Sequence, residues 1–222
     1  MKNILIVGDS LGLPRQNLSY YKTWPYLMAS AMPTFHFIFK MKRALTTKMF
    51  FQDTHMDWLE FYNPDDVIMQ VGIVDCAPRF LKKDGFFIKI LSVSPGFINN
   101  MVWKIIKKYG KRSPKFSDVS PNDFKSNLQN YLQRCDKSGV KRVFLIKIAC
   151  PGSIMIKSNP TIYLQVKKYN EIIEKIAYNK SKCILVDTLE EADDSYFLED
   201  GYHLSELGNK ILFYSICKVL ND

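Results

Sequence analysis

The stretch that most constrains the fold is residues 4–10, where four apolar β-forming residues run directly into Gly8-Asp9-Ser10. A continuous apolar run of this length, ended by glycine, is typical of a strand buried on both faces of a parallel sheet. Ser10 then lies on the turn at the carboxyl end of that strand, which is the edge where open α/β sheets bind ligands. Because a serine hydroxyl is a poor nucleophile without a base, another part of the chain has to supply one.

The candidate base comes from a small set, since the chain has only three histidines, His36, His55 and His203. His203 follows Asp200 by three residues, with a glycine between them. This spacing lets one loop deliver a base together with the carboxylate that orients it. We therefore predict that Ser10 and His203, near opposite ends of the chain, become neighbours in the fold.

These two signatures, Gly8-Asp9-Ser10 near the start and Asp200-x-x-His203 near the end, together resemble those of the SGNH (GDSL-like) hydrolase superfamily. The resemblance spans nearly the whole chain. It implies a flavodoxin-like α/β fold, a three-layer sandwich with helices on both faces of a five-stranded parallel sheet in the order 2-1-3-4-5. It also implies that Ser10 is the nucleophile, His203 its base and Asp200 the acid that orients the base. Asp9 takes a supporting role, and neither a metal nor an organic cofactor is needed.

Apolar runs and helix signals alternate through the rest of the chain, as an α/β sandwich requires. Strands are predicted at residues 35–39, 66–72, 142–149 and 182–186, and helices at 24–32, 97–109, 120–137, 159–178 and 205–220. No internal repeat and no linker divides the sequence, so we expect one domain over residues 1–222.

The sequence departs from the family pattern at the groups that bind the oxyanion. After the third strand the family usually has Gly-x-Asn-Asp, in which the Asn side chain helps to bind the oxyanion. Gly72 and Asp75 match this motif, but Val74 replaces the asparagine. The family's oxyanion glycine after the second strand has no counterpart, because no glycine occurs between Gly12 and Gly72. Losing one such donor costs on the order of 100- to 1,000-fold in turnover.

Other groups are candidates for binding the oxyanion or the substrate. The Ser10 N–H is expected to remain as one donor, and the Gly72 N–H and the Arg79 guanidinium are candidates for the others. Asp75, at a matching motif position, is a further candidate. Arg79 is fixed in charge, so it is equally a candidate for holding an anionic group of the substrate. A surface arginine at a loop edge is the competing interpretation.

The formal net charge of +9 is concentrated in residues 80–116, a basic and aromatic insertion with nine Lys/Arg and a single acid, Asp84. Three interpretations fit this segment. It is a lid over the active-site edge, a surface that contacts an anionic membrane, or an ordinary packed helix with a solvated basic face. No nucleic-acid partner is expected, since no recognised binding module accompanies the charge.

The resemblance implies a serine esterase that acts on a small-molecule or glycan ester, and the basic insertion suggests deacetylation of a carbohydrate. Two alternatives stay open: transfer of the acyl group to a cell-surface glycan, and a catalytically inactive fold that binds a glycan or a partner. Nucleotide-dependent chemistry is disfavoured, because Gly8-x-x-x-Gly12 is not the dinucleotide fingerprint and no Walker motif is present.

Three features of the sequence favour a cytoplasmic protein. The apolar run before Asp9 is too short for the core of a signal peptide. No window of about 18 uncharged apolar residues exists that would span a membrane. The five cysteines are widely scattered without a Cys-x-x-Cys pair, which indicates reduced thiols and no zinc site.

Overall fold

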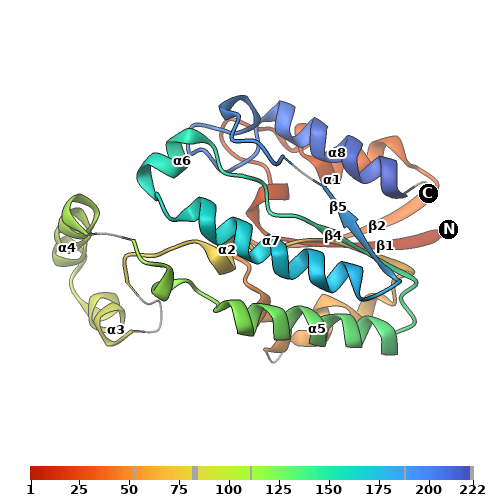
Figure 1. Ribbon diagram of the computed structural model, residues 1–222, viewed down its shortest axis with the longest axis horizontal. Coiled ribbons are helices and arrows are strands. Elements are labelled where there is room, and N and C mark those ends of the chain that lie inside the picture. The colour runs from red at the N-terminus through yellow and green to blue at the C-terminus, as the bar shows by residue number, and fades with distance from the viewer. Residues whose placement is uncertain (53, 82–84, 111, 188, 221–222) are drawn as a thin grey trace.

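The centre of the molecule is a five-stranded parallel sheet in the order β2-β1-β3-β4-β5, which confirms the predicted topology (Figure 1). The computed structural model describes the chain except for residues 53, 82–84, 111, 188 and 221–222. The strands are β1 (Lys2–Gly8), β2 (Phe35–Met41), β3 (Asp66–Gln70), β4 (Arg142–Ile146) and β5 (Cys183–Val186). Because all five run in one direction, their carboxyl ends lie along one edge of the sheet.

Two strands end earlier than their apolar runs. β3 ends at Gln70, because Gly72 turns the chain away from the sheet with a φ of 120°. β4 ends at Ile146, although the apolar run continues to Ala149. Beyond the strand, the Ile148 N–H donates to the side-chain Oδ1 of Asn170 at 2.8 Å, and the side-chain Nδ2 of Asn170 donates to the Ile148 carbonyl at 2.9 Å. The Asn170 side chain thus satisfies the backbone groups of a buried loop that a neighbouring strand would otherwise satisfy. Hydropathy alone could not reveal where the strand ends.

Helices cover both faces of the sheet, as the unbroken burial of residues 4–7 on β1 requires, since successive side chains point to opposite faces. Ile4 and Ile6 face a cluster formed with α1 (Trp24–Ala31) and α8 (Glu206–Leu220). Leu5 and Val7 face the larger cluster, formed with α5 (Pro121–Lys137) and α7 (Ile162–Tyr178). The result is the predicted three-layer sandwich, with every residue of this central strand from 4 to 7 fully buried.

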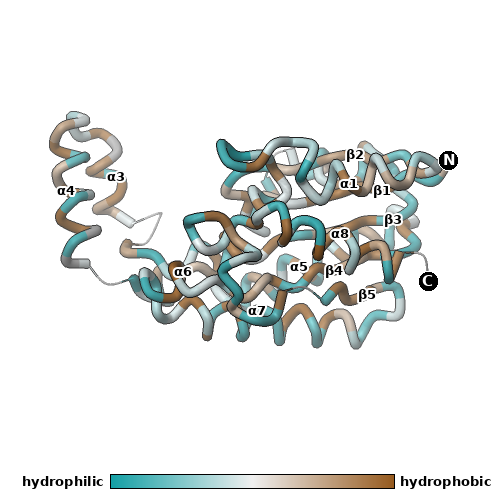
Figure 2. The backbone as a smooth tube through the Cα atoms, turned by 90° about the horizontal axis from the view of Figure 1, so that it is seen from above, coloured by the Kyte–Doolittle hydropathy of each residue, from teal (hydrophilic) through white to brown (hydrophobic). Residues whose placement is uncertain are grey.

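The predicted insertion forms a helical hairpin outside these three layers (Figures 1 and 2). It consists of α3 (Phe86–Val93) and α4 (Gly96–Tyr109), and α4 confirms the helix predicted at 97–109. The two ends of the segment meet in an antiparallel bridge, where the Ser113 N–H donates to the Arg79 carbonyl at 2.8 Å. The hairpin therefore leaves the domain and returns to it at a single place, just after α2 (Ile73–Cys76).

Short helices fill the remaining connections. The region before β3 contains 3-10 turns. α6 (Ser153–Ser158) was not predicted, and α7 starts later than the expected residue 159. The 3-10 turns are η1 (Ser10–Gly12), η2 (Tyr20–Lys22), η3 (Thr47–Phe51), η4 (His55–Trp58), η5 (Glu60–Tyr62), η6 (Pro114–Phe116) and η7 (Asp194–Tyr196). Within the described residues, the helices are all too short or too polar to cross a bilayer.

Candidate active site

Ser10 lies at the carboxyl end of β1, where a tight turn holds it in place. β1 ends at Gly8, and the Asp9 N–H donates to the Gln70 carbonyl of the neighbouring strand at 3.2 Å. The Asp9 carboxylate then caps η1 by accepting the Leu11 N–H at 2.9 Å. The turn presents Ser10 to a cavity at this edge of the sheet, and its side chain is nearly enclosed.

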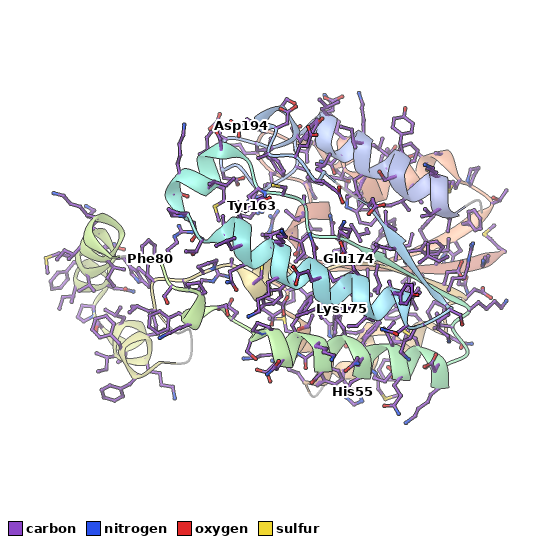
Figure 3. The ribbon with its side chains drawn as sticks, in the orientation of Figure 1. His55, Phe80, Tyr163, Glu174, Lys175 and Asp194 are labelled. Carbon is purple, nitrogen blue, oxygen red and sulfur yellow. The ribbon has the colours of Figure 1, made fainter. Side chains whose placement is uncertain are left out.

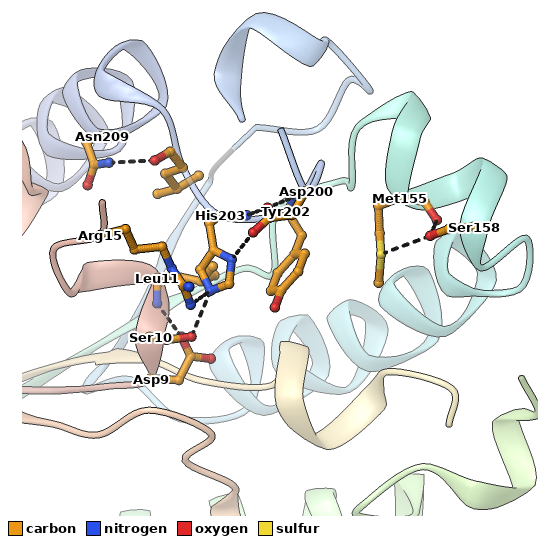
Figure 4. A network of polar contacts seen from close by, with 11 residues as sticks. Asp9, Ser10, Leu11, Arg15, Met155, Ser158, Asp200, Tyr202, His203 and Asn209 are labelled. Carbon is orange, nitrogen blue, oxygen red and sulfur yellow. Dashed lines mark hydrogen bonds and ion pairs between the residues drawn. The ribbon is translucent and has the colours of Figure 1, made fainter. Parts of the chain in front are cut away.

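The structure brings the two sequence signatures together, although Ser10 and His203 are 193 positions apart in the chain (Figure 4). The Ser10 Oγ and His203 Nε2 atoms are 3.0 Å apart. On the other side of the ring, His203 Nδ1 lies 2.6 Å from Asp200 Oδ2. With Nδ1–H donating to the carboxylate, Nε2 is the acceptor and faces the serine hydroxyl. This is the hydrogen-bonded order of a nucleophile, a base and an orienting acid.

The loop that carries Asp200 and His203 is closed by its own hydrogen bonds. Asp200 Oδ1 accepts the backbone N–H groups of Tyr202 at 3.1 Å and His203 at 2.9 Å. Gly201 sits between them with a φ of 74°, and a Cβ there would lie 2.7 Å from the Met155 nitrogen. Only glycine meets both conditions, so this residue fixes the spacing between the acid and the base.

The same contacts set the ionisation of the two groups. Burial acts to raise the pKa of Asp200, but the hydrogen bonds from the His203 ring and from two backbone N–H groups outweigh it and lower the pKa to about 2. Burial lowers the pKa of His203 from its ordinary value, and the contact with Asp200 only partly opposes this effect. At neutral pH the arrangement therefore combines an ionised carboxylate with a neutral imidazole, which is the form that accepts a proton.

No protein-family model matches the sequence, and no curated protein sequence matches it either. Solved structures are similar over nearly their whole length. A protein from Desulfitobacterium hafniense DCB-2, described as lipolytic and of the G-D-S-L family, has a TM-score of 0.66 at 13% identity, with 99% of both chains covered. The acetyl xylan esterase AlAXEase has a TM-score of 0.66 at 19% identity, covering 98% of this chain and 99% of that chain. The chain has the SGNH-hydrolase fold.

A third similar structure carries an inhibitor. It is that of the psychrotrophic esterase EstA from Pseudoalteromonas sp., inhibited by monoethylphosphonate, with a TM-score of 0.61 at 14% identity and 100% of both chains covered. The SGNH fold confirms the architecture that the two sequence signatures implied.

The cavity beside Ser10 has a volume of about 600 Å3. One wall comes from the β1 turn and the loop after β2, and another from α2, the residues just after it and the end of the insertion. α6, which was not predicted, supplies a third wall. Among the residues described, the lining comprises Ser10, Arg15, Arg43, Ala44, Ile73, Val74, Ala77, Arg79, Arg112, Ile154, Met155, Ser158, Asp200 and Tyr202. A second cavity of about 430 Å3, lined partly by the hairpin, shares Ala44, Arg79 and Arg112 with the first.

The predicted oxyanion and substrate candidates are placed in different ways. Arg79 lines the cavity, where its guanidinium pairs with Asp118 at 3.0 Å. Val74, at the position of the SGNH asparagine, lines it with an apolar side chain. Gly72 and Asp75 are not among the lining residues described. Asp75 is fully buried.

The Asp75 carboxylate points to the loop after β2, where it accepts the Thr47 N–H at 2.9 Å and the Thr47 hydroxyl at 2.7 Å. Burial raises the pKa of Asp75 to about 6. Burial likewise raises the pKa of Asp9 to about 7, and the nearby Asp75 carboxylate adds to this. The two acids thus lie beneath the cavity and support the loops that form it.

Ala44 is a site residue that sequence reasoning missed. It lies in the loop after β2, lines the cavity, and has a φ of 55°, in the left-handed region that favours glycine. Glycine is the residue that adopts this conformation without strain, and here an alanine takes it up. Nothing in the identity of an alanine signals this conformation, so the sequence alone could not point to this residue.

Arg15 and Arg112 were missed as well. The Arg15 Nη2 atom contacts His203 Nε2, on the same side of the ring as Ser10 (Figure 4). Arg112, from the far end of the insertion, reaches the cavity beside Arg79. Neither arginine belongs to a motif, and only the fold brings them to one place. Among the residues described, no group of three His, Cys, Asp or Glu side chains is arranged to hold a metal ion.

Proposed function

We propose that this protein is a serine esterase that removes a small acyl group, such as acetyl, from a carbohydrate or another small ester. The observation that carries the proposal is the continuous chain of contacts from Ser10 through His203 to Asp200 at the wall of a cavity. The similar structures support the reaction class, since two of them are described as esterases and one of these acts on acetyl xylan. The basic insertion suggests a carbohydrate substrate.

In the proposed reaction, Ser10 Oγ attacks the acyl carbonyl carbon while His203 Nε2 takes the hydroxyl proton. The carbonyl π electrons move to the oxygen, and Asp200 stabilises the imidazolium that has formed. Collapse of this tetrahedral species expels the alcohol, which receives its proton from His203. Water then attacks the acyl-serine with His203 as the base, and release of the carboxylic acid restores Ser10. We assign the Ser10 and Ala44 N–H groups as oxyanion donors.

One contact favours a second candidate function, a catalytically inactive fold that binds a glycan or partner. A guanidinium N–H that donates to His203 Nε2 occupies the lone pair that has to accept the Ser10 proton. If Arg15 keeps this position when ligands bind, Ser10 has no base. The same fold would then serve recognition only.

A fluorophosphonate probe separates the two functions, because it reacts covalently only with an activated serine. We expect the wild type to gain the probe mass on the peptide that contains Ser10, and Ser10→Ala and His203→Ala to gain none. Circular dichroism of all three proteins checks that the fold is intact. A folded wild type that is not labelled would favour the binding function. Product analysis of an acetylated sugar, with and without a second sugar as acceptor, then separates hydrolysis from acyl transfer.

A further inference from the structure

The cavity beside Ser10 is lined by an unusual number of positive charges. Four arginines reach it from four separate parts of the chain: Arg15, Arg43, Arg79 and Arg112. Among the described lining residues, Asp200 is the only acid, and its carboxylate is already hydrogen-bonded to His203. Hydrolysis of a neutral ester needs none of these guanidinium groups. Their convergence therefore calls for an explanation in terms of the substrate.

Two of the arginines have partners that use only part of their hydrogen-bonding capacity. Arg79 pairs with Asp118 at 3.0 Å through one terminal nitrogen. Arg43 donates to the Pro14 carbonyl at 2.8 Å. A guanidinium has five N–H donors in a planar fork, so each keeps donors that can serve a ligand.

In the other two, Arg15 and Arg112, one buried N–H group lacks a hydrogen-bond acceptor among the described residues. The Nε atoms of Arg15 and Arg112 are buried, and within the described part of the structure neither has a hydrogen-bond partner. Arg112 lies over the ring of Phe80, with its central carbon 4.9 Å from the ring centroid. Phe80 lies where the hairpin joins the domain (Figure 3). This stacking orients the guanidinium plane but accepts none of its N–H groups strongly. A buried donor without an acceptor is costly, and a bound ligand removes that cost.

We propose that this cavity binds an anionic group of the acylated substrate, a carboxylate or a phosphate, with Arg112 and Arg15 as its principal ligands; the inference rests on the proposed esterase function. Both groups present oxygen atoms at the spacing that a guanidinium fork matches. Burial and the neighbouring Arg79 lower the pKa of Arg112, so an anion would relieve repulsion between the two. An anion also gives Arg15 an acceptor other than His203 Nε2, which frees the base for Ser10.

Three acetate esters with closely matched phenol leaving groups test this inference. They are the acetates of 4-hydroxybenzoate, of its methyl ester and of 4-hydroxyphenyl phosphate, which carry a carboxylate, no charge and a phosphate. Each kcat/KM is divided by the rate of alkaline hydrolysis of the same ester, so that intrinsic reactivity cancels. We expect at least one anionic ester to exceed the neutral ester by about tenfold or more. The carboxylate and phosphate arms identify which anion is preferred.

Substitutions test whether a specific fork or only the overall charge is responsible. Arg112→Gln should reduce the anionic-to-neutral ratio to about threefold or less, and Arg112→Lys, which keeps the charge but loses the fork, should give an intermediate ratio. Lys218→Gln, an exposed charge on α8, removes the same net charge and should leave the ratio unchanged. An equal fall in Lys218→Gln would overturn the inference, because a long-range field would then explain the preference.

The outcomes distinguish this inference from the proposed function. Hydrolysis of all three esters at equal normalised rates overturns the anion site and leaves the esterase intact. If no ester is hydrolysed, the esterase proposal fails, and a binding measurement then tests whether the anion site exists. In that case calorimetry compares 4-acetamidobenzoate with its methyl ester. Tighter binding of the acid by about tenfold, lost in Arg112→Gln, supports the site, and equal binding overturns it.

A second observation concerns the hairpin of α3 and α4. Its apolar side chains are exposed to solvent to a degree seen nowhere else over so short a stretch of the described chain, with Phe86 79% and Phe97 74% exposed. Figure 2 shows the hairpin standing apart from the layered body. The exposed apolar side chains are Phe86, Phe87, Ile90, Val93, Phe97, Met101 and Ile105. A group of exposed apolar side chains as large as this one indicates a surface that contacts another molecule or a membrane.

We infer that the hairpin docks on an anionic lipid surface. Residues 80–116 carry nine basic residues against one acid, which complements acidic headgroups while the phenylalanines enter the interface. A second copy of the chain is a poorer partner, because it would bring an equally positive hairpin into contact. The ordinary packed helix with a solvated face, one of the three interpretations of this segment, does not account for the exposed apolar residues.

Sedimentation with vesicles tests the docking. We expect the wild type to pellet with vesicles of phosphatidylcholine and phosphatidylglycerol, less with phosphatidylcholine alone, and less at high salt. Phe86→Ser/Phe97→Ser should lose about fivefold or more of the bound fraction. Tyr178→Ser/Tyr214→Ser removes two exposed aromatics from α7 and α8 and should bind like the wild type. The inference is wrong if the wild type stays in solution, or if the first double variant only abolishes a dimer seen by size exclusion.

Discussion

The two sides of the cavity beside Ser10 are built by opposite principles. On the side formed by the sheet edge, Ser10, Asp200 and His203 are held by short backbone turns and contact one another. On the side formed by the insertion, Arg112 is held mainly by stacking on Phe80, and the helices beyond it expose apolar residues. The difference suggests that the sheet edge fixes the groups proposed to react, whereas the insertion determines which ligand binds. The lid interpretation of residues 80–116 stays a prediction within this division.

The largest expected difference between the two sides is in the rate of ester hydrolysis. Ser10→Ala or His203→Ala should reduce hydrolysis of p-nitrophenyl acetate by about 10,000-fold or more, because either change removes a group that acts in the bond-making step. Asn100→Ala, an exposed change on α4, should alter the rate by no more than about twofold. Steady-state kinetics at pH 7.5 measures both. A comparable loss in the α4 variant would show that the insertion takes part in the chemistry.

A contrast in stability should be next in size. Phe144 on β4 is fully buried between the sheet and its helices, so Phe144→Ala should lower the free energy of unfolding by about 3–5 kcal/mol. Phe97→Ala removes the same atoms from an exposed position on α4 and should change it by about 0.5 kcal/mol or less. Denaturant unfolding followed by circular dichroism gives both values. Similar losses in the two variants would mean that the hairpin packs against the body in solution.

The buried acid behind Ser10 should give a smaller, pH-dependent effect. Asp9 titrates near pH 7 when folded, against an ordinary value of 3.8, so the folded state holds an extra proton between these values. Its contribution therefore falls as pH rises, by about 2 kcal/mol between pH 5 and pH 7. Asp9→Asn keeps an oxygen for the Leu11 N–H but cannot ionise. Its unfolding free energy relative to the wild type should rise by that amount, whereas equal pH profiles would place the Asp9 pKa near its ordinary value.

The smallest expected effect concerns the loop after β2. Ala44 has a left-handed backbone conformation, which costs an alanine about 1 kcal/mol relative to glycine. Ala44→Gly should raise the melting temperature by a few degrees and keep the rate of ester hydrolysis, since the N–H remains. Ala44→Val should lower both quantities, because a β-branched residue resists this conformation. A neutral valine variant would show that neither stability nor hydrolysis depends on the left-handed conformation of this residue.

Much of the architecture could be predicted from the sequence, because it follows from local patterns. The buried run of residues 4–7 identified the central strand, and the spacing of Asp200 and His203 identified the loop that meets it. The end of β4 could not be predicted, since the hydrogen bonds of Asn170 to Ile148 join residues that no local pattern links. The arginine cluster was hidden for the same reason.

The position of Ala44 was hidden differently. Glycine is the usual signal of a left-handed residue, and an alanine in that conformation carries no signal at all. For Asp75 the motif position was recognised, but the direction of its carboxylate depends on Thr47, which lies in a different loop. The sequence alone therefore identified the groups proposed to react, but not the positions of the residues around them.

The bridge between Arg79 and Ser113 has a consequence for how this molecule can be altered. Two backbones that are hydrogen-bonded side by side in antiparallel orientation can be joined by a two-residue turn such as Asn-Gly. The segment between Arg79 and Ser113 can therefore be shortened or exchanged without moving either of these two residues. A gene that gained or lost such a segment in one step would keep the same three-layer body while changing the molecules that this body contacts.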